Sequence, residues 1–341
     1  MNAILKQRLK MALLAALAAF VGYFLKPADS PVVPAPPTIP IPQEAAPHGF
    51  GWIPDPKAVE DVRSTLPTPI FRETEAFRSE YAGPEDVYLW EACRKVTGNV
   101  LPARDQKSVG CCVGFGTTAA VEHLMCVQAA NGSGEKFREI APEIIYGGSR
   151  VAIGGGKVRG DGSVGAWAAK FVNQYGVLPR GVYGSLDLTR YDERTCRSLG
   201  DRGVPDELEP TVKEHPVKAV ANVRSWAEAQ AAIHNGYPVA VCSSQGFGMV
   251  RDAEGFCPPQ GVWYHCMALI GVRAGSRPGG FLLNSWGSTA HSGPQAPGEP
   301  PAGFWADARV LDRMLNEGDS WTLSAFAGFP AQKLDWYAKV K

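Results

Sequence analysis

The sequence predicts an α+β protein with two lobes and a functional cleft between them. The chain has 341 residues, which is long enough to bury a core in each of two lobes. Helical patterns dominate its first half, and short apolar strands dominate from about residue 216 onward. The 38 glycines and 28 prolines indicate a loop-rich fold rather than a helical bundle. We therefore expect a helical lobe over about 105–215 and a β-rich lobe over about 216–341.

The first lobe is predicted from helical periodicity. After Cys112 the chain reads V-G-F-G-T-T-A-A-V-E-H-L-M-C-V-Q-A-A-N-G, which predicts a buried helix of about 18 residues ending at Asn131 and Gly132. Apolar residues at helical spacing predict a second helix over 163–175, and a shorter helix is expected over 142–146.

The second lobe is predicted from short apolar runs. Strands are expected over 217–223, 238–242, 265–272 and 281–284. Between the first two strands, Ser225 and Glu228 form a capping box that opens a helix.

The N-terminus differs in character from the rest. Residues 11–25 form an uncharged apolar run behind three basic residues, too short for the roughly 20 residues of a spanning helix but typical of a signal core. We interpret 1–26 as a signal-anchor that places the bulk of the protein outside the cytoplasm, with a cleaved signal of a secreted protein as the alternative. A buried core helix fits the basic flank poorly.

A proline-rich stretch follows this segment. Residues 27–56 contain ten prolines, which predicts an extended, semi-rigid linker. A short N-terminal arm over 57–89 and a main domain over 90–341 complete the expected organisation. Such an order of anchor, stalk and globular domain is typical of a protein tethered at a membrane.

Charge and cysteine content exclude several classes of function. The 34 basic and 34 acidic residues balance, which argues against a nucleic-acid partner. Eight cysteines are present in a compartment that permits disulfides, but their connectivity cannot be deduced from the sequence. No C-x-x-C pair occurs, so neither a zinc ribbon nor a thioredoxin-type site is indicated, and we expect no metal.

Two adjacent cysteines, Cys111 and Cys112, stand at the start of the first predicted helix. The partial positive charge of a helix N-terminus lowers the pKa of a thiol there and makes it a candidate nucleophile. Two small buried side chains are the simpler explanation. Periodicity alone does not choose between the thiols, because adjacent helical positions differ by only about 100°.

A nucleophile needs a base and a group that orients the base. His265 opens one predicted strand and Asn284 ends the next. If these strands are antiparallel neighbours, the Asn284 side-chain oxygen can accept from the imidazole and fix its tautomer. Alone, each residue would be an ordinary core histidine or a turn asparagine. Together with the cysteine they form an ordered Cys, His, Asn set.

The blocks around these residues resemble the three active-site blocks of papain-like cysteine proteases: D-Q-K-S-V-G-C-C-V-G-F-G, Y-H-C-M-A-L-I-G-V and F-L-L-N-S-W-G-S. The resemblance extends from about Trp90 to about Trp286. It implies a papain-like two-lobed fold with the active-site cleft between the lobes. It also implies a cysteine-type peptidase that forms an acyl-enzyme on peptide or protein substrates, without a cofactor and as a monomer.

The resemblance implies a role for each matching residue. Cys112 would be the nucleophile, His265 its base and Asn284 the group that orients the base. Trp286 would shield the hydrogen bond between His265 and Asn284. The Gln106 side-chain amide would donate to the oxyanion together with the backbone N–H of the nucleophile.

The groove and the surroundings of the nucleophile depart from the family pattern. Gly162 and Ser163 would line the substrate groove, although the family usually has glycine at the second position. Cys111 and Val113 flank the nucleophile where the family usually has serine and tryptophan. Val109 replaces a disulfide cysteine of the family.

These departures keep two other functions open. One is a non-catalytic binding module with a papain fold, and the other is a cysteine amidase acting on cell-wall peptides, for which an anchor and stalk would be suitable. The arm over 57–89 lacks the long helical pattern of the family's inhibitory propeptides. Either activation is controlled in another way, or this arm lies over the lobes.

Overall fold

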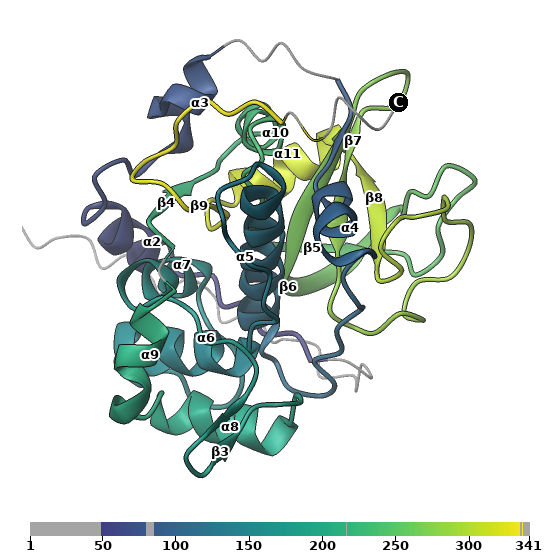
Figure 1. Cartoon of the computed structure of the whole chain (residues 1–341). Coiled ribbons are helices and arrows are strands. Elements are labelled where there is room, and N and C mark those ends of the chain that lie inside the picture. Colours follow the sequence, from purple (N-terminus) through teal and green to yellow (C-terminus); the bar gives the residue numbers. More distant parts are fainter. Residues whose placement is uncertain (1–48, 80–84, 216, 335, 337–341) are drawn as a thin grey trace, which may run out of the picture. The chain divides into compact units, whose positions relative to one another are not determined.

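Helices occupy the first half of the described chain and a large antiparallel sheet occupies the second half (Figure 1). The computed structural model describes residues 49–79, 85–215, 217–334 and 336, which belong to one compact unit, Ala45–Lys341. This arrangement confirms the α+β class with a helical and a β-rich lobe.

The helical elements in chain order are α2 (Pro56–Arg63), η1 (Phe71–Glu73), α3 (Glu75–Arg78), α4 (Trp90–Thr97), α5 (Cys112–Ala130), α6 (Pro142–Gly148), the π-helical η2 (Ser149–Ile153), α7 (Gly165–Gln174), α8 (Glu193–Arg202), η3 (Asp206–Leu208), α9 (Glu209–Lys213), α10 (Trp226–His234) and α11 (Ala308–Asn316). The strands are β1 (Val87–Tyr88), β2 (Val182–Tyr183), β3 (Leu186–Asp187), β4 (Ala219–Asn222), β5 (Val239–Phe247), β6 (Pro259–Arg273), β7 (Gly279–Leu283), β8 (Gly303–Asp307) and β9 (Trp321–Ser324).

Helix α5 is the central helix, and it begins at the second cysteine of the pair. It is buried on all sides from its first residue to Gln128, which explains why apolar residues dominate all its faces rather than one stripe. It packs against α4, α6 and the strands β5 and β6. At Gly116 the approach to β6 is so close that a Cβ atom would lie 2.8 Å from Cys266 Sγ. A larger residue would therefore push the helix off the sheet.

The main sheet has the strand order β4-β9-β5-β6-β7-β8, and β1 pairs with β6 in addition. Its long central strand β6 is antiparallel to both β5 and β7. Ser243 pairs with His265, but the next pair is Gln245 with Val262, so β6 carries an extra residue. This bulge coincides with Tyr264, whose φ of 45° is unusual for a residue with a side chain. The bulge redirects the backbone next to His265.

Two predicted elements differ in ways that affect the site. His265 lies inside β6 rather than at the start of a strand, because β5 continues its pairing as far as Phe247 with Pro259. Helix α7 begins at Gly165, later than expected, because the backbone of Ser163 pairs with Trp52 in a parallel bridge. The capping box is present as predicted: Ser225 Oγ accepts from Glu228 N at 3.3 Å and caps α10.

The N-terminal arm contacts both lobes: α2 packs against α7, and Phe71 packs on the β-rich lobe. Phe71 is fully buried and lies edge-on to the rings of Tyr237 and Phe329. The predicted signal-anchor, 1–26, and most of the linker lie outside the described residues. Within the part of the chain that the structure describes, no helix is both long and apolar enough to cross a membrane.

Candidate active site

The two adjacent thiols lie in different environments. Cys111 belongs to a small cluster that contains Tyr146 and Cys196, and its Sγ is 3.4 Å from Tyr191 Oη. Cys112, the first residue of α5, belongs instead to the main core. Both side chains are fully buried. Cys112 interacts with the backbone of Cys266, which follows His265 on β6, whereas Cys111 interacts with Cys196 and Tyr191.

The predicted base and its orienting residue are in direct contact. His265 Nε2–H donates to Asn284 Oδ1 at 2.9 Å, and the backbone N–H of Ser285 donates to the same oxygen at 2.7 Å. The contact forms because β6 and β7 are antiparallel neighbours and Asn284 directly follows β7. The ring of Trp286 covers His265, with ring centroids 4.5 Å apart. This arrangement limits the access of water to the hydrogen bond.

Gln106 lies beside this pair. Its backbone N–H donates to Ser285 O at 2.9 Å, and its side-chain Oε1 accepts from Ser285 Oγ at 2.6 Å. Two carbonyl oxygens on the other side of the amide fix its orientation, because they can only accept, whereas the Ser285 hydroxyl could donate or accept. Nε2 donates to Val109 O and Gly49 O, each at 2.8 Å.

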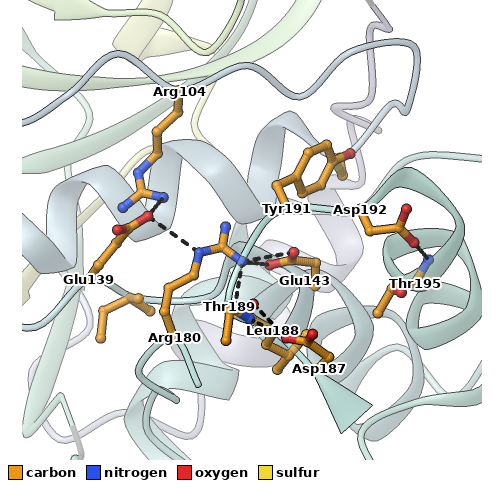
Figure 2. A network of polar contacts seen from close by, with 12 residues as sticks. Arg104, Glu139, Glu143, Arg180, Asp187, Leu188, Thr189, Tyr191, Asp192 and Thr195 are labelled. Carbon is orange, nitrogen blue, oxygen red and sulfur yellow. Dashed lines mark hydrogen bonds and ion pairs between the residues drawn. The ribbon is translucent and has the colours of Figure 1, made fainter. Parts of the chain in front are cut away.

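An ion-pair network holds the segment just before this glutamine (Figure 2). Arg104 pairs with Glu122 of α5 and with Glu139, the latter at 3.2 Å. Arg180 reaches Glu139 at 3.3 Å and Glu143 of α6 at 3.0 Å. Because the side chains of Glu122 and Glu143 are buried, each needs a cation nearby. The network thus ties the segment to the helical lobe.

The predicted substrate groove is filled by the chain's own residues 49–53. Tyr264 O accepts from the backbone N–H groups of Gly51 and Trp52, at 3.2 and 2.9 Å. Ser163 N donates to Gly51 O at 2.8 Å, and Ser163 O accepts from Ile53 N at 2.9 Å. These residues were expected to be the last part of the linker. Instead, the covering segment, as we name residues 49–53, satisfies the backbone groups that would bind an extended peptide.

Glycine permits this close approach. A Cβ atom on Gly51 would lie 1.9 Å from Gly110 O, and one on Gly162 would lie 2.9 Å from Ile53 Cδ1. Both contacts are shorter than side chains tolerate. Ser163 and Gly162 therefore contact the covering segment directly, in the positions proposed for groove residues.

Burial under the covering segment changes the chemistry of Cys112. Burial raises the pKa of Cys112 well above its usual range, while backbone groups of Cys266, Gly51 and Val113 oppose the rise. The sequence predicts a lowered pKa from the helix N-terminus. The difference arises because loss of hydration under the covering segment raises the pKa of Cys112 by more than the N-terminus of α5 lowers it.

A buried carboxylate anchors the covering segment. Trp52 Nε1–H donates to Asp319 Oδ2 at 2.8 Å, as does the backbone N–H of Gly165. Trp321 Nε1–H donates to Asp319 Oδ1 at 2.8 Å. Burial raises the pKa of Asp319 to about 6, although these donors act in the opposite direction.

We expect Asp319 to make stability pH-dependent. Its pKa is about 6 when folded and about 3.9 in an unfolded chain. The folded state therefore binds the proton more tightly. Protonated Asp319 therefore contributes about 3 kcal/mol to the free energy of unfolding below about pH 4. This contribution is lost as the pH rises to about 6. Urea unfolding should show that parent stability falls over this range relative to Asp319→Asn, with Asp206→Asn as the exposed control. A difference that does not vary with pH would contradict this assignment.

The structure also reveals site residues that the sequence did not indicate: Trp52, Ser285, His291 and Asp319. Ser285 follows Asn284 directly, so the N-S-W-G block could have drawn attention to it. No sequence pattern marks His291 or Asp319 as a site residue, because each lies on a loop that only the folded chain brings to the site. Among the described residues, no group of three or more His, Cys, Asp or Glu side chains is arranged to hold a metal ion.

Similar folds are found among the solved structures of known proteins. No family model and no curated protein sequence matches the chain. Xylellain, a cysteine protease from Xylella fastidiosa, is similar with a TM-score of 0.55 and 18% identity, over 82% of this chain and 96% of that chain.

Two further structures are more distant. The ragweed pollen allergen Amb a 11, a cysteine protease in its proform, has a TM-score of 0.50 and 15% identity, over 75% of this chain and 70% of that chain. Bromelain from Ananas comosus, in complex with the E64 inhibitor, has a TM-score of 0.45 and 16% identity, over 71% of this chain and 99% of that chain. From the two lobes and the similarity to xylellain we conclude that this chain has the fold of the papain-like cysteine proteases.

Proposed function

We propose that the protein is a cysteine-type peptidase in which Cys112 is the nucleophile, His265 the base and Asn284 the residue that orients the base. One observation carries the proposal. His265 Nε2–H donates to Asn284 Oδ1 in a buried site, and its neighbour on β6, Cys266, contacts the start of α5 at Cys112 and Gly116. A Cys, His, Asn set on facing elements is suited to acyl transfer.

The reaction follows from these positions. The Cys112 thiolate attacks the carbonyl carbon of the peptide bond while His265 holds the proton. The oxyanion accepts from Gln106 Nε2–H and from the backbone N–H of Cys112. The C–N bond then breaks, and His265 passes its proton to the leaving amine. Water, deprotonated by His265, attacks the thioester and releases the acid, which restores the thiolate.

The covering segment makes the described state a latent one in this proposal. The Gly49 carbonyl accepts from Gln106 Nε2, the donor that the oxyanion requires. The backbone of Gly51 interacts with the Cys112 thiol. A substrate needs the same groups, so the segment must leave before catalysis. The sequence left open that the arm over 57–89 lies over the lobes; the residues that contact this site belong to the predicted linker instead.

The proposal is tested with a peptide library, using the full chain and the segment-displaced variant Gly51→Ala, in which the new Cβ would lie 1.9 Å from Gly110 O. We expect cleavage products whose formation stops after treatment with an epoxide thiol-protease inhibitor. If the displaced variant cleaves no peptide but binds a protein tightly, the protein is a binding module and the proposal fails. Cleavage of cell-wall peptides alone would establish the amidase alternative.

We expect Gln106→Ala to lower kcat by about 100-fold to 1,000-fold, because one donor to the oxyanion is lost. The measurement is steady-state hydrolysis in the displaced variant, so that release of Gly49 does not mask the effect. Gln174→Ala, an exposed glutamine at the end of α7, is the matched control. A change in KM without a fall in kcat would contradict a role of Gln106 in stabilising the transition state.

We also propose that residues 11–25 tether the enzyme to a membrane and leave the peptidase domain outside the cytoplasm. The support is the basic flank and the apolar run of the sequence. Fractionation of cells that express the full chain tests this. Recovery of the full-length protein only in the soluble cytoplasmic fraction would contradict it.

A further inference from the structure

A second histidine lies behind the predicted triad. Asn284 Nδ2 is 3.0 Å from His291 Nε2, and His291 Nδ1 is 3.6 Å from Cys257 Sγ. With the bond from His265 to Asn284, these contacts form a continuous chain from His265 to Cys257. Asn284 and His291 are both 3% exposed. The chain is therefore shielded from water.

The position of each proton in this chain follows from the donors. The backbone N–H of Ser285 and the Nε2–H of His265 both point to one atom of the Asn284 amide, which must be the oxygen. The amide nitrogen therefore points to His291. Because that nitrogen can only donate, His291 Nε2 must accept, and the proton of the neutral ring must be on Nδ1.

The loop that carries His291 is held rigidly. Arg251 Nη1 donates to His291 O at 2.9 Å, while its other nitrogens donate to Gly303 O and Pro301 O. Arg251 is itself buried, so its guanidinium fixes three carbonyl groups of the same region. On the inner side, the imidazole of His291 lies against Phe304, with ring centroids 4.5 Å apart. The ring is thus placed before substrate binds.

We propose that His291 is a positioning residue for His265: by accepting from the Asn284 amide, it holds the oxygen of that amide toward His265. The catalytic meaning of this role rests on the proposed function, because it requires His265 to be the base. The orientation of Asn284 does not. Without the acceptor, Asn284 Nδ2 would be buried and unpaired, and the amide could turn over. It would then present N–H groups to His265 Nε2–H and to Ser285 N–H.

Burial and the charges around His291 keep its ring neutral. Burial is the main cause, and together with the charges of Arg251 and His265 it lowers the pKa of His291 to about 3. Cys257 is the other titratable group that faces the ring, and burial raises the pKa of its thiol to about 12, so it remains uncharged. The acceptor on Nε2 is therefore present at any pH at which a peptidase of this kind would work.

The decisive experiment compares His291→Leu, which removes the acceptor, with His291→Gln, whose side-chain oxygen can replace it. In the segment-displaced enzyme we expect His291→Leu to lower kcat/KM about 10-fold. We also expect the alkaline limb of its pH profile to move about one unit lower, because the imidazolium of His265 loses the bond that favours it. His291→Gln should restore most of both values. His234→Gln, a half-buried histidine at the end of α10, is the control.

A purely structural role predicts a different result. Both variants would then lose active enzyme to a similar extent, and the limb would not move. That outcome would overturn the proposal. A limb that moves in His291→Leu and returns in His291→Gln would support it.

A second measurement needs no substitution at His291 and no enzymatic activity. Nitrogen NMR of full-length Cys112→Ala, labelled with 15N in histidine, reports the tautomer of each ring. We expect His291 to be protonated on Nδ1 and bare on Nε2 down to about pH 4. A ring protonated on Nε2 would overturn the positioning role. If Cys112 is not a nucleophile, this tautomer is still expected, so failure of the proposed function can be told apart from failure of this inference.

Discussion

We expect Cys112→Ala to abolish peptide hydrolysis, with kcat falling about 10⁴-fold or more, whereas Cys111→Ser retains most of it. The reason is geometric. Cys112 begins α5 and interacts with the backbone of Cys266, next to His265, while Cys111 packs into a separate cluster beside Tyr191. Serine at position 111 can keep the contact with the tyrosine hydroxyl.

The measurement combines turnover of a peptide with mass spectrometry of the labelled thiol. In the segment-displaced protein an epoxide inhibitor should add to Cys112, and labelling should vanish in Cys112→Ala alone. Equal rates in the parent and in Cys112→Ala, with loss in Cys111→Ser, would reverse the assignment of the two thiols.

The second large effect is expected from a single methyl group. Gly51→Ala should displace the covering segment, because the new Cβ would lie 1.9 Å from Gly110 O. Rotation of a side chain cannot relieve an overlap between two backbone regions. Once the segment leaves, hydration returns to Cys112 and its pKa falls from the raised value of the covered state. We therefore expect the rate of Cys112 alkylation at neutral pH to rise at least about 10-fold.

The control is a glycine with room for the methyl group. At Gly181 a Cβ atom would lie 3.4 Å from the ring of Tyr183, which is an ordinary contact. Gly181→Ala should leave the alkylation rate unchanged. Limited proteolysis gives an independent readout, since a displaced segment should be cut between residue 49 and the start of α2. An alkylation rate in Gly51→Ala equal to that of the parent would show that the segment does not control access.

Local sequence patterns were sufficient for the principal elements. The predominantly apolar sequence after Cys112 predicted a buried helix, and α5 is buried along nearly its whole length. The Ser225 capping box predicted the start of α10, because that signal depends on one hydrogen bond within a single turn. Strand limits were less accurate, since pairing with a neighbour extends β5 and β6 beyond their apolar cores.

The fold class and a candidate set of Cys, His, Asn and Gln follow from the sequence, because they depend on periodicity and on motifs that are contiguous in the chain. The hydrogen bonds of residues 49–53 to Ser163 and Tyr264, and the contacts that bring His291 and Asp319 to the site, follow only from the tertiary structure. Those contacts join residues far apart in the sequence and depend on backbone shape, such as the bulge at Tyr264 and the tight packing at Gly51. No local pattern encodes such contacts, since each one exists only after both lobes have folded against each other.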